Sequence, residues 1–325
     1  MRALLFDGTA VKYRQYQADP VPGPDEALIK VEMAGVCQTD LEISQGYMNF
    51  KGVLGHEFVG TVLKCKDTDK KWLGKRVVGE INCVCGKCDM CQRGLSTHCR
   101  HRGVLGIANK DGAFADLVTL PLRNLHEVPA NVSLEEAVFV EPLAAAVQVL
   151  RQVPIDARTK VTVLGDGRLG QLVAQVVHRH SKAMELVGRH GTKLAIAERL
   201  GIPTRLEREL QPRRDQDVVI DCTGRVEGLE RALTLVRPRG TVVLKTTVVG
   251  SKPMNLAGVV IDEITILGSR CGPFADALAL LGQKQVDVAC LVSRRTRLEA
   301  AEGLFAPGGT GWPRETLKVL LTFDR

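Results

Sequence analysis

Apolar residues between positions 160 and 270 fall into short runs that alternate with amphipathic segments. The run at 161–164 leads into a glycine-rich turn and then a segment with helical apolar periodicity, and another run follows at 184–187. Three later runs, DVVIDCTG, GTVVLKTT and ITILGSR, have the same strand-like character. Strands that alternate with helices form a parallel sheet with right-handed crossovers. The pattern therefore predicts an α/β fold with a doubly wound parallel sheet in this region.

The N-terminal segment has a different pattern. MRALLFDGTAVKYRQ alternates like a strand and lacks the apolar centre of a signal peptide. No apolar run in the chain reaches the length needed to cross a bilayer. We therefore expect a cytoplasmic protein without a membrane partner.

Composition and charge narrow the function classes. The 325 residues are 45% hydrophobic and 25% charged, which suits two folded domains with sizeable cores. Lys and Arg outnumber Asp and Glu by 44 to 37, a net charge of +7 for which a solvated basic surface is the simplest explanation. No basic run is interleaved with aromatic residues, so we expect no nucleic-acid partner.

Cysteines supply the first candidate chemistry. Five of the ten lie in the loop 83–99, and a reducing compartment favours metal binding over disulfides for such a cluster. Four of them have the spacing C-x2-C-x2-C-x7-C: Cys85, Cys88, Cys91 and Cys99. This spacing predicts a tetrahedral zinc, with an iron–sulfur cluster as the alternative, although Arg100 stands where ferredoxins have proline. Four protein ligands leave no open position, so the site would be structural, and we expect Cys83 to be an ordinary strand residue.

A second metal site is predicted from a thiolate, an imidazole and a carboxylate. Cys37 precedes His56 by nineteen residues, and Glu57 follows directly. These three groups are suitable zinc ligands, and Asp40 is placed to hold the other nitrogen of His56. Glu141 precedes Pro142 at an expected helix start, where it is either a further ligand or simply a carboxylate that the helix dipole favours.

The glycine-rich turn after the first predicted strand indicates dinucleotide binding. Gly165, Gly167 and Gly170 lie between a strand and a helix, together with Arg168 and Leu169. An NAD site has an acidic residue at the end of the second strand, but this chain has instead Gly188, Arg189 and His190, with Lys193 nearby. Arginine can pair with a 2′-phosphate, so we expect NADP rather than NAD; the alternative is a mere surface arginine.

Taken together, these motifs resemble the zinc-dependent medium-chain dehydrogenases, which include alcohol, sorbitol, threonine and glucose dehydrogenases. The resemblance implies a GroES-like catalytic domain (1–142 and 273–325) and an inserted NADP-binding Rossmann domain (143–272). It implies a catalytic zinc on Cys37, His56 and Glu141, with Glu57 as a carboxylate that approaches the metal. It also implies two zinc ions per chain, a homodimer or homotetramer, and pairing through the ITILGSR strand.

The resemblance also assigns roles to further residues. Thr39 would accept the substrate proton while zinc polarises the alcohol oxygen and hydride passes to the cofactor. Glu42 stands where some relatives have a relay histidine. The residues expected to contact the cofactor are Gln38, Thr223, Gly224, Thr246 and Arg270, the last of which otherwise belongs to a domain hinge.

The substrate that the resemblance favours is a secondary alcohol, polyol or sugar, with reversible carbonyl reduction. Two alternatives are a zinc-poor enone or quinone reductase of the same superfamily and a non-enzymatic module built on the cysteine loop. We expect interdomain linkers near 143–159 and around Pro273.

Overall fold

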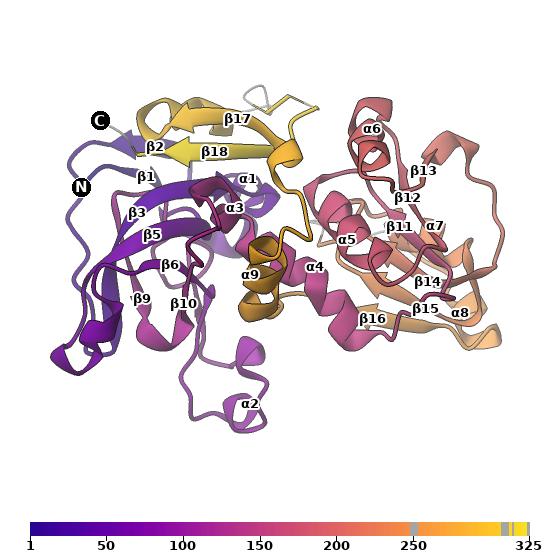
Figure 1. Ribbon diagram of the computed structural model, residues 1–325, viewed down its shortest axis with the longest axis horizontal. Helices are drawn as coiled ribbons and strands as arrows, with labels where there is room; N and C mark the ends of the chain where they lie inside the picture. The colour runs from indigo at the N-terminus through magenta and orange to yellow at the C-terminus, as the bar shows by residue number, and fades with distance from the viewer. Residues whose placement is uncertain (248–252, 307–311, 314, 324–325) are drawn as a thin grey trace. The chain divides into compact units, whose positions relative to one another are not determined.

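The computed structural model describes residues 1–247, 253–306, 312–313 and 315–323. The chain forms two compact units (Figure 1). Unit 1 comprises Met1–Glu141 and Ala277–Arg325, and unit 2 comprises Pro142–Asp276. The second unit is therefore an insertion in the first. None of the described helices is both long and apolar enough to cross a membrane.

Unit 1 is built mainly from β-strands. Its largest sheet has seven strands in the order β10-β6-β5-β3-β18-β17, and β9 also pairs with β3. A three-stranded sheet has the order β2-β1-β4, and β7 pairs with β8. The strands are β1 (Ala3–Phe6), β2 (Val11–Arg14), β3 (Glu26–Val36), β4 (Gly52–Val53), β5 (Glu57–Lys64), β6 (Arg76–Gly79), β7 (Asn82–Cys83), β8 (Gly103–Val104), β9 (Leu117–Pro121), β10 (Leu125–Glu127), β17 (Val292–Arg297) and β18 (Lys318–Thr322).

The centre of this sheet positions most of the candidate ligands. β3 pairs with β5 on one side and β18 on the other, with Gly35 opposite Glu57 and Leu320 respectively. Alternate residues of β3 are buried, as expected for a strand that packs one face on a core. The site therefore draws on strands that are distant in sequence but adjacent in the sheet.

Helices of unit 1 are short and mark the ends of strands. They are α1 (Gln38–Ile43), α2 (Asp89–Gln92), α3 (Leu134–Val138) and α9 (Phe274–Gly282), whose first residues belong to unit 2, together with the 3₁₀ turns η1 (Tyr47–Asn49), η2 (Asp67–Trp72), η3 (Ser96–His98), η4 (Leu122–Asn124), η6 (Ala289–Leu291) and η7 (Leu298–Phe305). α3 begins with a capping box in which Ser133 Oγ accepts the Glu136 N–H and Glu136 accepts the Ser133 N–H.

Unit 2 contains a six-stranded sheet in the order β13-β12-β11-β14-β15-β16, and all its strand pairs are parallel. This confirms the predicted doubly wound fold. The strands are β11 (Val161–Leu164), β12 (Met184–Gly188), β13 (Thr204–Leu206), β14 (Gln216–Asp221), β15 (Val236–Leu244) and β16 (Thr265–Gly268). The helices are α4 (Val140–Gln152), α5 (Arg168–His178), α6 (Gly191–Arg199), α7 (Gly228–Leu233) and α8 (Ala257–Ile261), with the 3₁₀ turn η5 (Glu207–Glu209).

Apolar side chains hold the helices of unit 2 on its sheet. α5 and α6 contact β12, and α7 contacts β14 and β15. One buried cluster joins Leu164, Val187, Val219, Leu235 and Val242. The central strand β11 is buried along its whole length, as expected where both faces of a parallel sheet are covered.

The linker expected at 143–159 is helical in its first part. Residues up to Gln152 belong to the thirteen-residue helix α4, in which Glu141 lies in the first turn. The segment LAAAVQVLRQ contains strong helix formers without glycine, and Pro142 is tolerated because it falls in the first turn. The chain thus enters unit 2 through a helix rather than through a flexible loop.

Candidate metal centres and dinucleotide site

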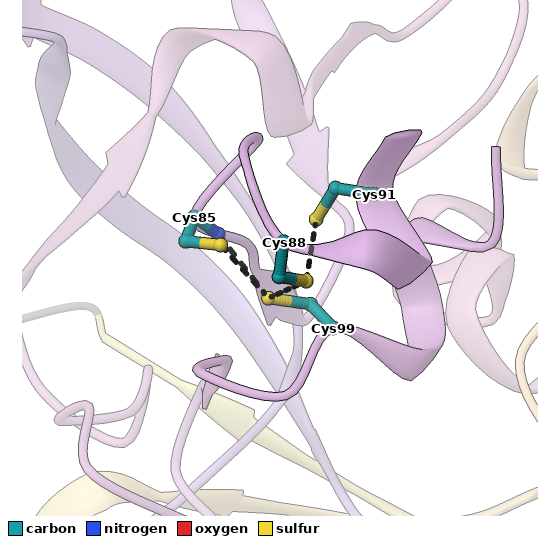
Figure 2. Close-up of side chains that lie close together, drawn as sticks. All are labelled: Cys85, Cys88, Cys91 and Cys99. Carbon is teal, nitrogen blue, oxygen red and sulfur yellow. Dashed lines mark hydrogen bonds between the residues drawn. The ribbon is translucent and has the colours of Figure 1, made fainter. Parts of the chain in front are cut away.

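The four cysteines of the predicted zinc loop lie together (Figure 2). Sγ of Cys99 is 3.5 Å from that of Cys85 and 3.8 Å from that of Cys88, and Cys88 Sγ is 3.6 Å from Cys91 Sγ. Four thiolates bound at about 2.3 Å around one tetrahedral ion have sulfurs about 3.8 Å apart. The spacing in this loop therefore fits a single ion such as Zn²⁺.

Backbone N–H groups that donate to two of these sulfurs favour the thiolate form, which is the form that binds a cation. N–H groups of Cys91 and Arg100 lower the pKa of Cys88 to about 6, and N–H groups of Lys87 and Cys88 lower that of Cys85. Burial, together with hydrogen bonds to the sulfurs of Cys88 and Cys99, raises the pKa of Cys91 to about 12. The donor set fits zinc.

Cys83 lies in β7, as expected for a strand residue, and does not belong to this group of sulfurs. Burial raises its pKa to about 11, so its thiol stays protonated at neutral pH. The sulfurs that lie close enough to share one ion are those of Cys85, Cys88, Cys91 and Cys99, so Cys83 is not part of this candidate site.

Asp40 joins the second candidate site to the start of α1. Cys37 is the N-cap residue of α1, and its N–H donates to Asp40 Oδ2 at 2.8 Å. The other oxygen of this fully buried carboxylate lies 3.2 Å from Nδ1 of His56. The spacing C-x-x-D thus sets both the helix cap and the orientation of the imidazole.

His56 is almost fully buried, between β4 and β5. Burial alone lowers the pKa of its ring, but the neighbouring Asp40 and the contact with Cys37 raise that pKa well above the ordinary value. A metal ion would replace this proton on the nitrogen that faces Cys37. One ligand atom each from Cys37, His56 and Glu57 lie within 4.8 Å of one another, which is a geometry suited to zinc.

Lys318 is a member of this site that the sequence reasoning missed. Its ammonium group, on β18, forms an ion pair with Glu57, and both side chains are fully buried. The same group lies 5.1 Å from the ring centroid of Phe139. A Cβ atom at Gly35 would come within 2.7 Å of the Glu57 carboxylate, so glycine at this position leaves room for the pair. The sequence signal was a single lysine in the otherwise apolar segment LKVLLTF.

Glu141 does not belong to the group of ligand atoms formed by Cys37, His56 and Glu57 among the described residues. It lies half-buried in the first turn of α4, so its role as a ligand stays a prediction. Thr39 is also half-buried, with Oγ1 3.8 Å from Cys37 Sγ, whereas Gln38 is exposed. Burial raises the pKa of Glu42, which lies on the next turn of α1.

The glycine turn of unit 2 has the predicted backbone. It links β11 to α5, and Gly165 has a φ of +109°, which favours glycine. A Cβ atom at Gly170 would lie 1.8 Å from the Gly165 carbonyl oxygen, so the turn can close only with glycine there. The turn leads directly into the N-terminus of α5, and a helix N-terminus is an arrangement that binds phosphate groups.

A cavity of about 200 Å³ opens beside this turn. Seven predicted residues line it: Gly165, Gly167, Gly188, Arg189, His190, Lys193 and Thr223. Other predicted cofactor residues do not line it: Gln38, Arg168, Leu169, Gly170, Gly224, Thr246 and Arg270. Gly224 and Thr246 are nevertheless joined, since the Gly224 N–H donates to Thr246 Oγ1 at 3.0 Å. Arg270 is exposed, and its carbonyl accepts from buried Lys245.

Four cavity residues were missed by the sequence reasoning, namely Asp166, Glu207, Cys222 and Arg225. Asp166 is part of the glycine turn, and Glu207 and Arg225 belong to charged segments where pattern alone does not separate surface from site. Burial raises the pKa of Cys222 to about 12, so its thiol stays neutral.

Comparison with known proteins identifies the family. Residues 23–130 match the alcohol dehydrogenase GroES-like domain, and residues 169–309 match the zinc-binding dehydrogenase family. A sorbitol dehydrogenase of Halalkalibacterium halodurans is 30% identical over 99% of both chains. An L-threonine 3-dehydrogenase of Streptomyces avermitilis is 31% identical over 90% of this chain and 91% of its own length.

Solved structures agree with these matches. A zinc-binding dehydrogenase of Sinorhizobium meliloti, solved bound to NADP, has a TM-score of 0.88 and 28% identity over 99% of both chains. The alcohol dehydrogenase of Thermus sp. ATN1 has a TM-score of 0.87 and 28% identity over the full length of both chains. The chain belongs to the zinc-type medium-chain dehydrogenase/reductase family.

Membership of this family defines the class of reaction. The chain is a zinc-dependent alcohol oxidoreductase that uses NAD(P) and acts on CH–OH donors. The family supports zinc and NADP as cofactors. The alternative of an enone or quinone reductase is not favoured, because the named relatives are alcohol and polyol dehydrogenases.

Proposed function

We propose that this enzyme oxidises a secondary alcohol of a polyol or sugar with NADP, and reduces the matching carbonyl in reverse. The observation that carries the proposal is the group formed by Cys37, His56 and Glu57, whose ligand atoms lie within 4.8 Å of one another. Sorbitol and L-threonine, named in the relatives, both carry secondary hydroxyl groups.

We assign two zinc ions to each chain. The cysteine loop would hold one with Cys85, Cys88, Cys91 and Cys99, and the other would be held by Cys37 and His56 with a carboxylate, either Glu57 or Glu141. Four sulfur ligands saturate the first ion, whereas the second keeps a position for water or substrate. The first site is therefore structural and the second catalytic.

The chain's own residues orient the substrate and remove a proton. Bound zinc supplies Lewis-acid polarisation of the alcohol, and bound NADP supplies a hydride acceptor. The Thr39 hydroxyl would accept the proton of the substrate hydroxyl and pass on its own, since its Oγ1 lies 3.8 Å from Cys37 Sγ and its side chain is only half-buried. We assign the outward transfer of this proton to Glu42 on the next turn of α1, whose pKa is raised by burial.

Cofactor binding belongs to unit 2, which we equate with the proposed NADP domain of residues 143–272, while 1–142 and 273–325 form the catalytic domain. Gly165, Gly167, Arg168, Leu169 and Gly170 place the pyrophosphate at the start of α5. The 2′-phosphate lies at Gly188, Arg189, His190 and Lys193. The rest of the cofactor would contact five further residues: Thr223, Gly224, Thr246, Arg270 and Gln38.

Assembly and location complete the proposal. β16 is an edge strand of the parallel sheet, and Val260 and Ile261 beside it are 76% and 78% exposed, which supports a homodimer or homotetramer formed there. The ten cysteines all lie in the described part of the chain and form no disulfide there, which supports the reducing cytoplasm.

A substrate panel with metal analysis tests the proposal. Purified enzyme should contain two zinc ions per chain and oxidise one or more polyols or secondary alcohols faster with NADP⁺ than with NAD⁺. Arg189→Ala should slow the reaction with NADPH and spare that with NADH; equal losses would contradict the assignment of Arg189. One zinc or none, with turnover of enones or quinones only, would contradict the proposed reaction.

A further inference from the structure

Two arginines reach the cavity of unit 2 from opposite sides of the glycine turn. Arg189 follows β12 and Arg225 follows β14, and these strands flank β11 in the sheet. Both side chains line the cavity of about 200 Å³. Only Arg189 stands at the position where the sequence motif places a residue for the ribose. Arg225 therefore brings a second guanidinium group that the motif does not account for.

Glu207 is the common partner of both arginines. Arg225 Nη2 donates to the two carboxylate oxygens of Glu207 at 2.7 and 2.9 Å, and Arg189 Nε lies 3.9 Å from the same carboxylate. Glu207 also lines the cavity, and its side chain is 23% exposed. One carboxylate thus gathers two guanidinium groups at the wall of a dinucleotide site.

Hydrogen bonds from neighbouring residues hold the backbone of the loop that carries Glu207. Arg231 Nη2, on α7, donates to the carbonyl oxygens of Glu207 and Leu210 at the two ends of η5. The Arg225 N–H in turn donates to Thr223 Oγ1 at 3.2 Å. The backbone on both sides of the ion pair is therefore held, and a change of partner needs only side-chain movement.

Asp166, the other carboxylate of the cavity, is already occupied. Its Oδ2 accepts the N–H groups of Arg189 and His190, each at 2.7 Å, and lies 3.0 Å from the His190 ring. A Cβ atom at Gly188 would lie 2.4 Å from Asp166 Cβ, so this approach requires glycine. Asp166 therefore serves the loop rather than a ribose hydroxyl, which leaves Glu207 as the carboxylate that can exchange partners.

We propose that Arg225 is a second ligand of the cofactor's 2′-phosphate, and that Glu207 holds the two arginines until the phosphate replaces its carboxylate. This deepens the NADP preference proposed above and rests on it. A phosphate offers arginine the same bidentate geometry as a carboxylate, with a larger negative charge. Glu207 then both orients the arginines and opposes the phosphate through its own charge. NADP must displace it, whereas NAD leaves the ion pair intact.

Dissociation constants of the full-length zinc-loaded enzyme for NADP⁺ and NAD⁺, measured by calorimetry without substrate, test this proposal. Arg225→Gln should weaken NADP⁺ binding about tenfold or more and change NAD⁺ binding less than about twofold. Arg225→Lys keeps the positive charge but not the two-pronged guanidinium group, so it should weaken NADP⁺ binding less than Arg225→Gln does. Arg208→Gln is the matched control, because Arg208 is 79% exposed and does not line the cavity.

Glu207→Gln should change the affinity for NADP⁺ in the opposite direction. Removal of the negative charge should tighten NADP⁺ binding several-fold and leave NAD⁺ binding unchanged, since glutamine can still accept from Arg225. The proposal is overturned if wild-type enzyme prefers NADP⁺ but Arg225→Gln and Arg225→Lys keep that preference, or if Glu207→Gln weakens NADP⁺ binding. If wild-type enzyme itself does not prefer NADP⁺, the cofactor preference under the proposed function is wrong instead.

Discussion

The two cysteine-containing candidate metal sites of unit 1 are built in two different ways. The loop of Cys85, Cys88, Cys91 and Cys99 takes like ligands from fifteen consecutive residues, and three of the four are partly exposed. The site of Cys37, His56 and Glu57 combines three kinds of ligand at the ends of β3 and β4 and the start of β5. Its neighbours Asp40 and Lys318 are fully buried. Local chemistry suffices to hold an ion, whereas a site that must react depends on the surrounding fold.

The largest expected effect separates activity from stability. Cys37→Ser should lower kcat about a thousandfold or more, because a serine hydroxyl is a much weaker zinc ligand than a thiolate and the alcohol would lose its polarising ion. Its thermal midpoint should remain close to that of wild type. Steady-state kinetics beside calorimetric melting checks this, and a variant that loses stability in proportion to activity would erase the contrast between the sites.

The opposite pattern is expected in the cysteine loop. Cys91→Ser should lower the thermal midpoint by about 10 °C or more, because structural zinc contributes directly to folding. The preparation should lose one zinc ion by elemental analysis, and the enzyme that remains folded should keep its kcat. Cys83→Ser is the matched control, since Cys83 does not belong to the group of four sulfurs, and it should retain the full zinc content. Loss of zinc in the control would show that the loop recruits its ligands differently.

The Lys318–Glu57 pair tests how far burial sets the second site apart. Lys318→Met should destabilise the protein by about 3–5 kcal/mol, because it leaves a buried carboxylate without its partner. The double variant Lys318→Met/Glu57→Gln should recover most of that loss. Urea unfolding of the three proteins measures it. A single variant as stable as wild type would mean that the pair contributes nothing net to the fold.

A smaller effect is expected at Asp40. Asp40→Asn keeps an acceptor for the Cys37 N–H but places an amide against His56, so zinc affinity at this site should fall about 10- to 100-fold. Competition with a chelator, followed by the zinc content of each site, measures the change. The cysteine loop should release its ion at the wild-type rate. Equal weakening of both sites would show that the substitution acts on the fold as a whole.

Sequence reasoning succeeded where the pattern is local. The parallel sheet follows from apolar runs such as 161–164, and the thiol spacing of the loop brings its sulfurs together through two short turns. It missed Lys318 because 261 residues separate this lysine from Glu57, and only the pairing of β18 with β3 brings them together. Glu207 and Arg225 escaped for a different reason, since they belong to charged segments where pattern alone does not separate surface from site.

The connection between the two units was predicted in part. The sequence predicted a helix start at Glu141 and Pro142, and the alanines and leucines that follow extend α4 to Gln152, through the first part of the expected linker. Which metal ligands lie together could also be predicted only in part from the sequence. A sequence shows that Cys37, His56, Glu57 and Glu141 are suitable donors, but the distances that select Glu57 for the described group depend on packing.

The place of Lys318 in β18 sets an order on events during synthesis. The cysteine loop has all its thiols by residue 99, so a nascent chain can capture an ion there while the ribosome is still translating unit 2. The other site lacks the cation beside Glu57 until residue 318 has emerged and its strand has docked along β3. A chain released before residue 318 would thus have a cysteine loop able to bind its ion but an incomplete catalytic site.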